Sequence, residues 1–186
     1  MLFTDDLKCI QSDIKKTLRP SNAPTPPSNF GSPSHGKLKA DEWRACIEFD
    51  LPVSLAKLWG GEVADGDHDY ALALESTFLL AMAIRYATSH RSTPRHLEKY
   101  LNYMQKYLQT VLDLHPSGKL LPNHHNALHL PKFMEYFGPI HGWWMFPFER
   151  LIGLLQKHKT NFKFGELEET VIKTFCATSY LKRLLN

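Results

Sequence analysis

The chain has 186 residues, of which 43% are hydrophobic and 22% charged, and this composition is typical of a globular protein with a buried core. Its formal net charge of +3 is only mildly basic, so charge alone gives weak support for a nucleic-acid partner. Three widely spaced cysteines without a CxxC pair argue against a disulfide framework, and neither a signal peptide nor a membrane span is visible, which predicts a nuclear or cytoplasmic protein.

Two short segments come first. Apolar residues at helical spacing predict an N-terminal amphipathic helix within residues 1–18. Residues 19–36 are rich in proline and serine, so they cannot hold a helix, and we expect an extended connector. Phe30 is the isolated apolar residue of this connector, and we expect it to anchor the segment on a larger body.

Residues 37–186 are predicted to be one helical domain. Its first helix runs from Lys39 to Trp59, where a pair of glycines ends it. Pro52 lies inside this stretch and is expected to break or kink the helix, because proline has no amide hydrogen to donate.

The remaining helices follow in order. Residues 71–87 are apolar on almost every side, which predicts a helix at the centre of a bundle. Thr93 is expected to cap a helix that opens at Pro94. Further helices are predicted over 123–137 and 147–157, and a last one after Gly165. The fold class is therefore all-α, an irregular bundle of about seven helices.

Three histidines stand near the start of the 123–137 helix. His125 and His129 are four residues apart and share one face, the spacing of two ligands in a zinc site, and His124 is a third candidate. The alternative is that these rings cap the helix and bond to nearby backbone. The second interpretation is favoured, because no CxxC or second histidine pair completes a site.

Glu149 follows Pro147 in the first turn of a predicted apolar helix. A carboxylate there can simply complement the positive end of the helix dipole. It can also act as one ligand of a two-metal Mg²⁺ site for phosphoryl transfer, but such a site needs other carboxylates. None of the aspartates in this sequence follows a predicted strand, so the sequence offers no companion.

Aromatic and basic residues surround this helix. The aromatic residues Trp143, Trp144, Phe146 and Phe148 are expected to form core rather than a base-stacking platform. Four basic residues are weak candidates for DNA contact, and solvated helix ends would look the same. These four are Arg150, Lys157, Lys159 and Lys163. A second basic group consists of Arg85, His90, Arg91, Arg95 and His96.

Several blocks of the sequence, in order, resemble CACTA-type (En/Spm-like) transposases of fungi and plants. They span nearly the whole chain, which makes the resemblance fairly specific. The similar blocks are Lys37–Arg44, Leu51-Pro52, Leu58–Gly60, the Asn123, His125 and His129-Leu130 motif, Phe137–Pro139, Gly142–Trp144, Phe146 with Phe148–Arg150, Thr160-Asn161 and Gly165–Glu168.

The resemblance implies a fold and an activity. Members of this family are read as cut-and-paste DNA transposases with an RNase H-like core, in which two aspartates and a glutamate bind Mg²⁺. A helical insertion precedes the glutamate. On this mapping Glu149 is the third catalytic acid, and His129 with His125 or His124 resembles the histidine half of a zinc site. The chain would then be the C-terminal part: the helical insertion and the final-acid helix.

The sequence also departs from the family pattern. It has no strand-borne aspartate pair, no CxxC and no recognisable DNA-end-binding domain. We therefore expect the isolated chain to be inactive. The rival hypotheses are a helical module that binds DNA, a full-length transposase or a second copy of itself, a zinc hydrolase using the histidines and Glu149, and a relic without function.

Overall fold

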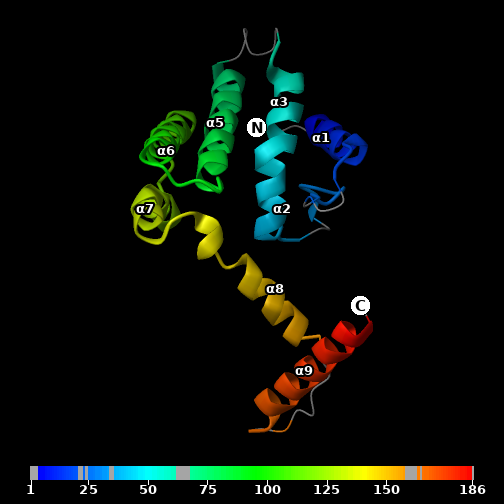
Figure 1. Cartoon of the computed structure of the whole chain (residues 1–186). Helices are drawn as coiled ribbons and strands as arrows, with labels where there is room; N and C mark the ends of the chain where they lie inside the picture. The colour runs from blue at the N-terminus through cyan, green and yellow to red at the C-terminus, as the bar shows by residue number, and fades with distance from the viewer. Residues whose placement is uncertain are drawn as a thin grey trace. The chain divides into compact units, whose positions relative to one another are not determined.

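The computed structural model describes residues 4–20, 23, 25–33, 36–61, 68–157, 163 and 165–185. All regular structure in these ranges is helical, which confirms the all-α prediction (Figure 1). The elements are α1 (Thr4–Lys16), α2 (Ala40–Ala45), π-helical η2 (Cys46–Asp50), α3 (Leu51–Trp59), α5 (His68–Ala87), α6 (Pro94–Leu114), α7 (Pro122–Phe137), the 3₁₀ turn η3 (Ile140–Gly142), α8 (Phe146–Leu155) and α9 (Leu167–Leu185). Because α2, η2 and α3 run on as one helix, the described ranges hold seven helical rods, as predicted.

The chain divides into two compact units, Met1–Trp143 and Trp144–Asn186, and each is described by itself. We call them the larger and the smaller unit. The boundary falls inside the predicted 37–186 domain, just before α8. None of the helices in the described ranges combines the length and the apolar character needed to cross a lipid bilayer.

Helix α5 is the centre of the larger unit. It packs along α6 on one side and along η2 and α3 on the other, while α1 covers α3 and α7 covers α6 (Figure 1). This arrangement follows from the sequence of α5, which is apolar around most of its circumference and needs cover on two sides. The prediction of a central helix is confirmed.

The first core cluster lies between α1, the connector and the α2–α3 helix. It buries Ile10, Ile14, Phe30, Cys46, Leu55 and Trp59. Phe30 is 6% exposed and meets Trp43 edge to face, with 5.9 Å between ring centroids. The Gln11 side-chain amide donates to the Phe30 carbonyl at 2.8 Å. Burying such a ring is worth roughly 1.5–3 kcal/mol, so the predicted anchor holds the connector against the helices.

The second core cluster lies between α5, α6 and α7 and is built on Ala83, Ala87, Tyr100, Met104 and Leu108. Tyr100 donates its hydroxyl to the Ala127 carbonyl at 2.9 Å. That carbonyl lacks its helical donor, because residue 131, four positions on, is a proline inside α7. Burial raises the pKa of the Tyr100 phenol, which keeps the donor protonated.

Pro52 does not break the helix that contains it, so this part of the prediction is wrong. The five residues of η2 widen into a π-helical turn, and the Leu51 amide donates to the Cys46 carbonyl five residues back. The wider turn lets the helix continue through the proline without a break.

The π-helical turn also carries a buried ion pair. Asp50 in η2 pairs with Arg19 in the connector, and their side chains are 2% and 13% exposed. Burial raises the pKa of the Asp50 carboxyl, while the Arg19 guanidinium opposes that rise. The same burial raises the pKa of Cys46, one turn earlier, to about 11.

We expect the ion pair to give a strongly non-additive response to mutation. Arg19→Met should cost about 3 kcal/mol of unfolding free energy, because it leaves the Asp50 carboxylate buried without a counter-charge. The double variant Arg19→Met/Asp50→Leu should recover to within about 1 kcal/mol of the native chain, because both desolvation penalties disappear. Urea unfolding followed by circular dichroism measures both values.

Lys57→Met is the matched control, because Lys57 forms an exposed ion pair with Asp13 at 2.9 Å. It should cost less than about 1 kcal/mol. Equal losses in Arg19→Met and Lys57→Met would contradict the prediction.

Candidate functional site

His124 is used by the local fold. It lies at the start of α7, where its Nδ1 accepts a hydrogen bond from the Leu121 amide at 3.2 Å. The first amides of a helix have no partner inside the helix, so this ring satisfies one of them. Of the three histidines proposed as metal ligands, His124 therefore fits the capping interpretation.

His125 and His129 converge on the exposed face of α7. Their Nε2 atoms lie 3.0 Å apart, and the rings meet edge to face with centroids 4.6 Å apart. Two nitrogens on one tetrahedral zinc ion lie about 3.3 Å apart, given Zn–N distances of about 2.0–2.1 Å. The two nitrogens are thus near the spacing of two adjacent ligands, and in the structure they lie at hydrogen-bond distance from each other. Within the described residues no group of three or more His, Cys, Asp or Glu is placed to hold a metal ion.

Glu149 is exposed on the surface of the smaller unit. It lies in the first turn of α8 with its side chain exposed, and its amide donates to the Met145 carbonyl at 2.9 Å. Among the described residues Glu149 belongs to no group of three or more His, Cys, Asp or Glu side chains that could hold a metal ion. By itself the carboxylate complements the helix dipole, and one carboxylate does not fix two metal ions.

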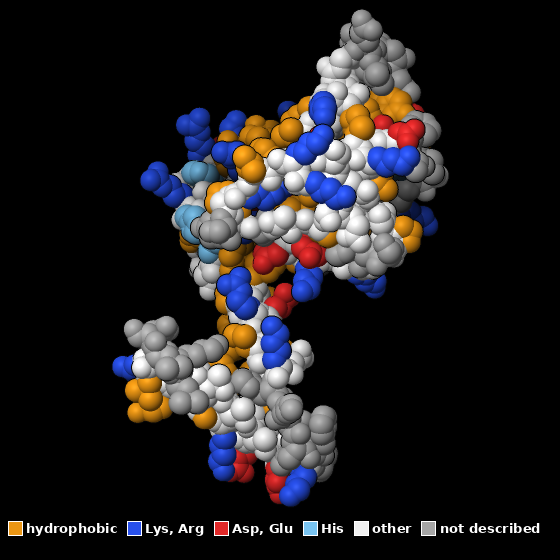
Figure 2. Space-filling model, turned by 90° about the vertical axis from the view of Figure 1, so that its right-hand side faces the viewer, with side chains coloured by type: hydrophobic (Ala, Val, Ile, Leu, Met, Phe, Trp, Pro, Cys, Tyr) orange, Lys and Arg blue, Asp and Glu red, His pale blue; other side chains and the backbone are white. Residues whose placement is uncertain are grey.

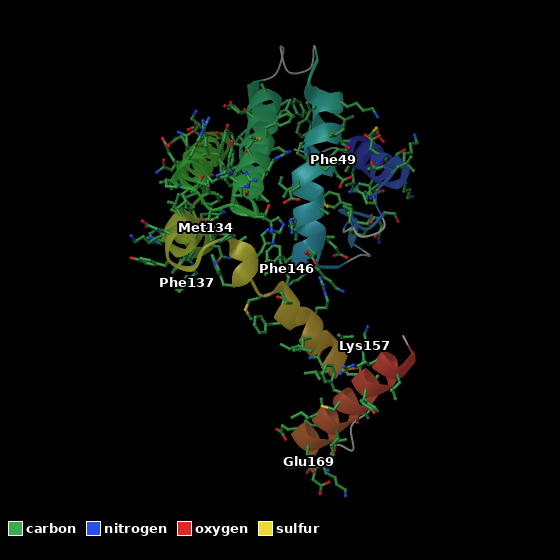
Figure 3. The ribbon with its side chains drawn as sticks, in the orientation of Figure 1. Phe49, Met134, Phe137, Phe146, Lys157 and Glu169 are labelled. Carbon is green, nitrogen blue, oxygen red and sulfur yellow. The ribbon has the colours of Figure 1, made fainter. Side chains whose placement is uncertain are left out.

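The aromatic residues near Glu149 belong to different units. Trp143 is the last residue of the larger unit. Its indole N–H donates to the Gly138 carbonyl at 3.1 Å, and its ring centroid lies 6.3 Å from that of Phe137, which Figure 3 labels. Trp144 meets Phe146 edge to face in the smaller unit, with centroids 4.9 Å apart. Trp143 thus packs against α7, but it is only half-buried, as are Trp144 and Phe146. Phe148 is 55% exposed, so the expectation that all four aromatic residues form core is wrong for Phe148.

Helix α8 exposes apolar side chains on most of its circumference. None of its residues is buried, although its sequence is almost entirely hydrophobic. The side chains that expose two-fifths or more of their surface are Phe148, Leu151, Ile152 and Leu154. An apolar helix is normally covered on several sides, so α8 presents a surface suited to another polypeptide.

The four predicted DNA contacts lie along the smaller unit or outside the described residues. Arg150 is exposed on α8, and Lys157 is exposed just after it (Lys157 is labelled in Figure 3). The Lys163 ammonium lies 3.8 Å from the Glu166 carboxylate, and Lys159 falls outside the described residues. Nothing in this arrangement forms a basic groove among the described residues, so these residues remain weak candidates.

The second basic group gathers at the turn between α5 and α6. Figure 2 shows Lys, Arg and His side chains side by side along one edge of the larger unit. Arg85 lines two open pockets, of about 190 and 340 Å³, on either side of its helix face. Among the described residues Arg85, Arg91 and Arg95 form no ion pair with an acid, so their charge faces outward.

Four contacts at or near this turn were missed by sequence reasoning. His90 stacks on His141 with 3.9 Å between centroids, and His141 Nε2 donates to the Thr88 carbonyl at 2.8 Å. Glu48 accepts hydrogen bonds from Arg44 at 2.9 Å and from the Thr88 hydroxyl at 3.0 Å. The four-residue spacing of Arg44 and Glu48 was a signal for their pair, but no local pattern points to the 53-residue link between positions 88 and 141.

Comparison of the chain with models of known protein families, with curated proteins and with solved structures finds no match in any of the three.

We expect His125 and His129 to bind Zn²⁺ weakly and together. His125→Ala and His129→Ala should each lower the Zn²⁺ affinity of the full chain about tenfold or more, because each removes one of two converging ligands. Isothermal titration calorimetry measures the affinities.

His124→Ala is the matched control, since its ring accepts from the Leu121 amide. It should leave Zn²⁺ affinity unchanged. Equal affinity in all three variants and the native chain would show that the pair does not bind the metal.

Proposed function

We propose that the chain is the helical insertion and final-acid helix of a CACTA-type DNA transposase, and that it works only with a second, carboxylate-bearing body. The proposal rests on the composition and exposure of helix α8. It places Glu149 in an exposed first turn, on a helix whose apolar residues are left uncovered. A helix of this kind supplies one metal ligand and a docking surface together.

The chemistry of the site sets what the second body must contribute. Transposition of this type joins DNA strands at a pair of Mg²⁺ ions held by three carboxylates. Glu149 would be one such carboxylate, and among the described residues it belongs to no group of three or more metal ligands. The two further acids, which the family resemblance assigns to strand-borne aspartates, would come from the body that covers α8. The parent activity is then DNA cleavage and strand transfer, and the isolated chain is inactive.

Complementation tests this proposal. The chain is mixed with a separately produced aspartate-bearing part of a CACTA-type transposase and with DNA carrying transposon ends. We expect Mg²⁺-dependent strand transfer only when both parts are present. Glu149→Gln should reduce it about 100-fold or more, because a metal ligand is lost. Glu168→Gln, an exposed acid of α9, is the matched control and should change nothing.

A variant of α8 separates docking from chemistry. Ile152→Glu should prevent association, measured by analytical ultracentrifugation, because it puts a charge into the apolar surface. Association without strand transfer would indicate that the chain is a protein-binding module and does not contribute to catalysis. Failure of the native chain to associate would overturn the proposal. Sequencing the transcript upstream of Met1 gives a second check: two strand-borne aspartates and a CxxC in the same frame are expected.

A DNA-binding module is the second candidate, favoured by the outward-facing arginines between α5 and α6. Phosphate contacts release counterions, so binding to duplex DNA should weaken steeply with salt. Arg91→Gln and Arg95→Gln should each lower the slope of log affinity against log salt by about 1, because each removes one phosphate contact.

Fluorescence anisotropy with a labelled duplex measures these slopes. Lys8→Gln, in an exposed ion pair with Asp5 on α1, is the control and should leave the slope unchanged. Equal slopes for all three variants would reject this second candidate.

A further inference from the structure

A small pocket lies in the larger unit, where α5 ends and α6 begins (Figure 1). Its volume is about 190 Å³, and it is lined by Met82, Arg85, Tyr86, Ser89 and His96. Among the described residues no acid lines it. The pocket therefore combines two largely apolar walls with three side chains that can donate hydrogen bonds, and this combination suits an anion.

Arg85 supplies the positive charge of the pocket. Its side chain is exposed, and Glu48 is the acid that lines the neighbouring, larger pocket with it. The Glu48 carboxylate is engaged elsewhere, because it accepts from the Arg44 guanidinium at 2.9 Å and from the Thr88 hydroxyl at 3.0 Å. A guanidinium that is not used in an internal ion pair presents its N–H groups as a planar fork, which matches the oxygens of a phosphate.

The local fold prepares the other two donors. The Ser89 hydroxyl oxygen accepts from the Arg91 amide at 3.2 Å, which uses a lone pair and leaves the hydroxyl proton for a ligand. The Thr93 hydroxyl oxygen accepts from the His96 amide at 3.3 Å and lies 2.5 Å from His96 Nδ1. When Thr93 donates its proton to Nδ1, the proton of the neutral imidazole is on Nε2, which then becomes a donor. An edge-to-face contact with Tyr86, 5.7 Å between centroids, holds the ring at the pocket.

The volume of the pocket limits the size of the ligand. Sites for drug-sized molecules occupy roughly 300–1,000 Å³, well above the 190 Å³ found here. The pocket has room for about six water molecules at about 30 Å³ each. A tetrahedral oxyanion such as phosphate fits this space, whereas a nucleobase with its sugar does not. Three donors of different kinds also favour an anion that has several oxygens over a halide.

We propose that this pocket binds a single phosphate group, with Arg85, Ser89 and His96 as its donors. The group is either free phosphate or the terminal phosphate of a nucleic-acid strand, and its chemistry inside the pocket is the same in both cases. The site does not rest on either proposed function, because inorganic phosphate can fill it without DNA and without α8. Arg91 and Arg95, on which the DNA-binding candidate depends, do not line it.

Equilibrium dialysis of the full chain against radiolabelled inorganic phosphate tests the site. We expect one phosphate per chain, with a dissociation constant on the order of 1 mM at low salt. Arg85→Gln should raise this constant about tenfold or more, because the charged donor is lost. His96→Phe should raise it about threefold or more, because the ring keeps its contact with Tyr86 but loses its donor.

Arg95→Gln is the matched control, because it removes the same charge from the same turn without changing the lining of the pocket. It should change the dissociation constant less than about threefold. Equal losses in Arg85→Gln and Arg95→Gln would show attraction by diffuse charge and would overturn the proposal. Native binding that does not saturate below about 20 mM would overturn it as well. Because Arg85 is exposed, Arg85→Gln should fold like the native chain, and circular dichroism checks this.

A competition experiment identifies the source of the phosphate. A short fluorescent single strand is prepared with and without a terminal phosphate, and its binding is measured by anisotropy. Tighter binding of the phosphorylated strand, lost in Arg85→Gln and reversed by inorganic phosphate, would assign the pocket to a nucleic-acid end. Equal binding of both strands, with saturable phosphate binding retained, would assign it to free phosphate. The DNA-binding candidate is judged separately, from the effect of Arg95→Gln on duplex binding.

Discussion

The larger unit depends on one constraint, which is that α5 must be covered on two opposite sides. Its apolar residues surround the helix, so no single neighbour can bury them. Helix α3 with η2 covers one side and α6 the other, and each of these then needs cover of its own. The connector and α1 supply it for α3, and α7 supplies it for α6. The two core clusters are thus consequences of one helix that lacks a polar face.

The smaller unit also contains apolar helices, but it has fewer neighbouring helices to cover them. Its helices are also rich in apolar residues, but α8 and α9 have only each other within the unit. The catalytic body proposed to cover α8 would bury the apolar residues of that helix.

Local signals predicted the larger part of the fold. The central helix, the Thr93 cap, the Phe30 anchor and the helical rods all follow from spacing, propensity and capping, which act over a few residues. Pro52 was misjudged because a π-helical turn depends on packing around Cys46 and Asp50, which no local pattern reveals. The Arg19–Asp50 pair and the His141–Thr88 link join distant positions for the same reason. At the candidate site, the meeting of His125 and His129 was predictable from their spacing, whereas the capping role of His124 was one of two open alternatives.

The hydrogen bond from Tyr100 to the Ala127 carbonyl has a consequence for how this sequence can diverge. The acceptor is a main-chain oxygen set free by a proline, so this hydrogen bond depends on no other side chain of α7. The outward residues of α7 can therefore change without removing it, provided that the tyrosine and the proline are both kept. In a set of diverged sequences, this tyrosine and this proline should be retained or lost as a couple.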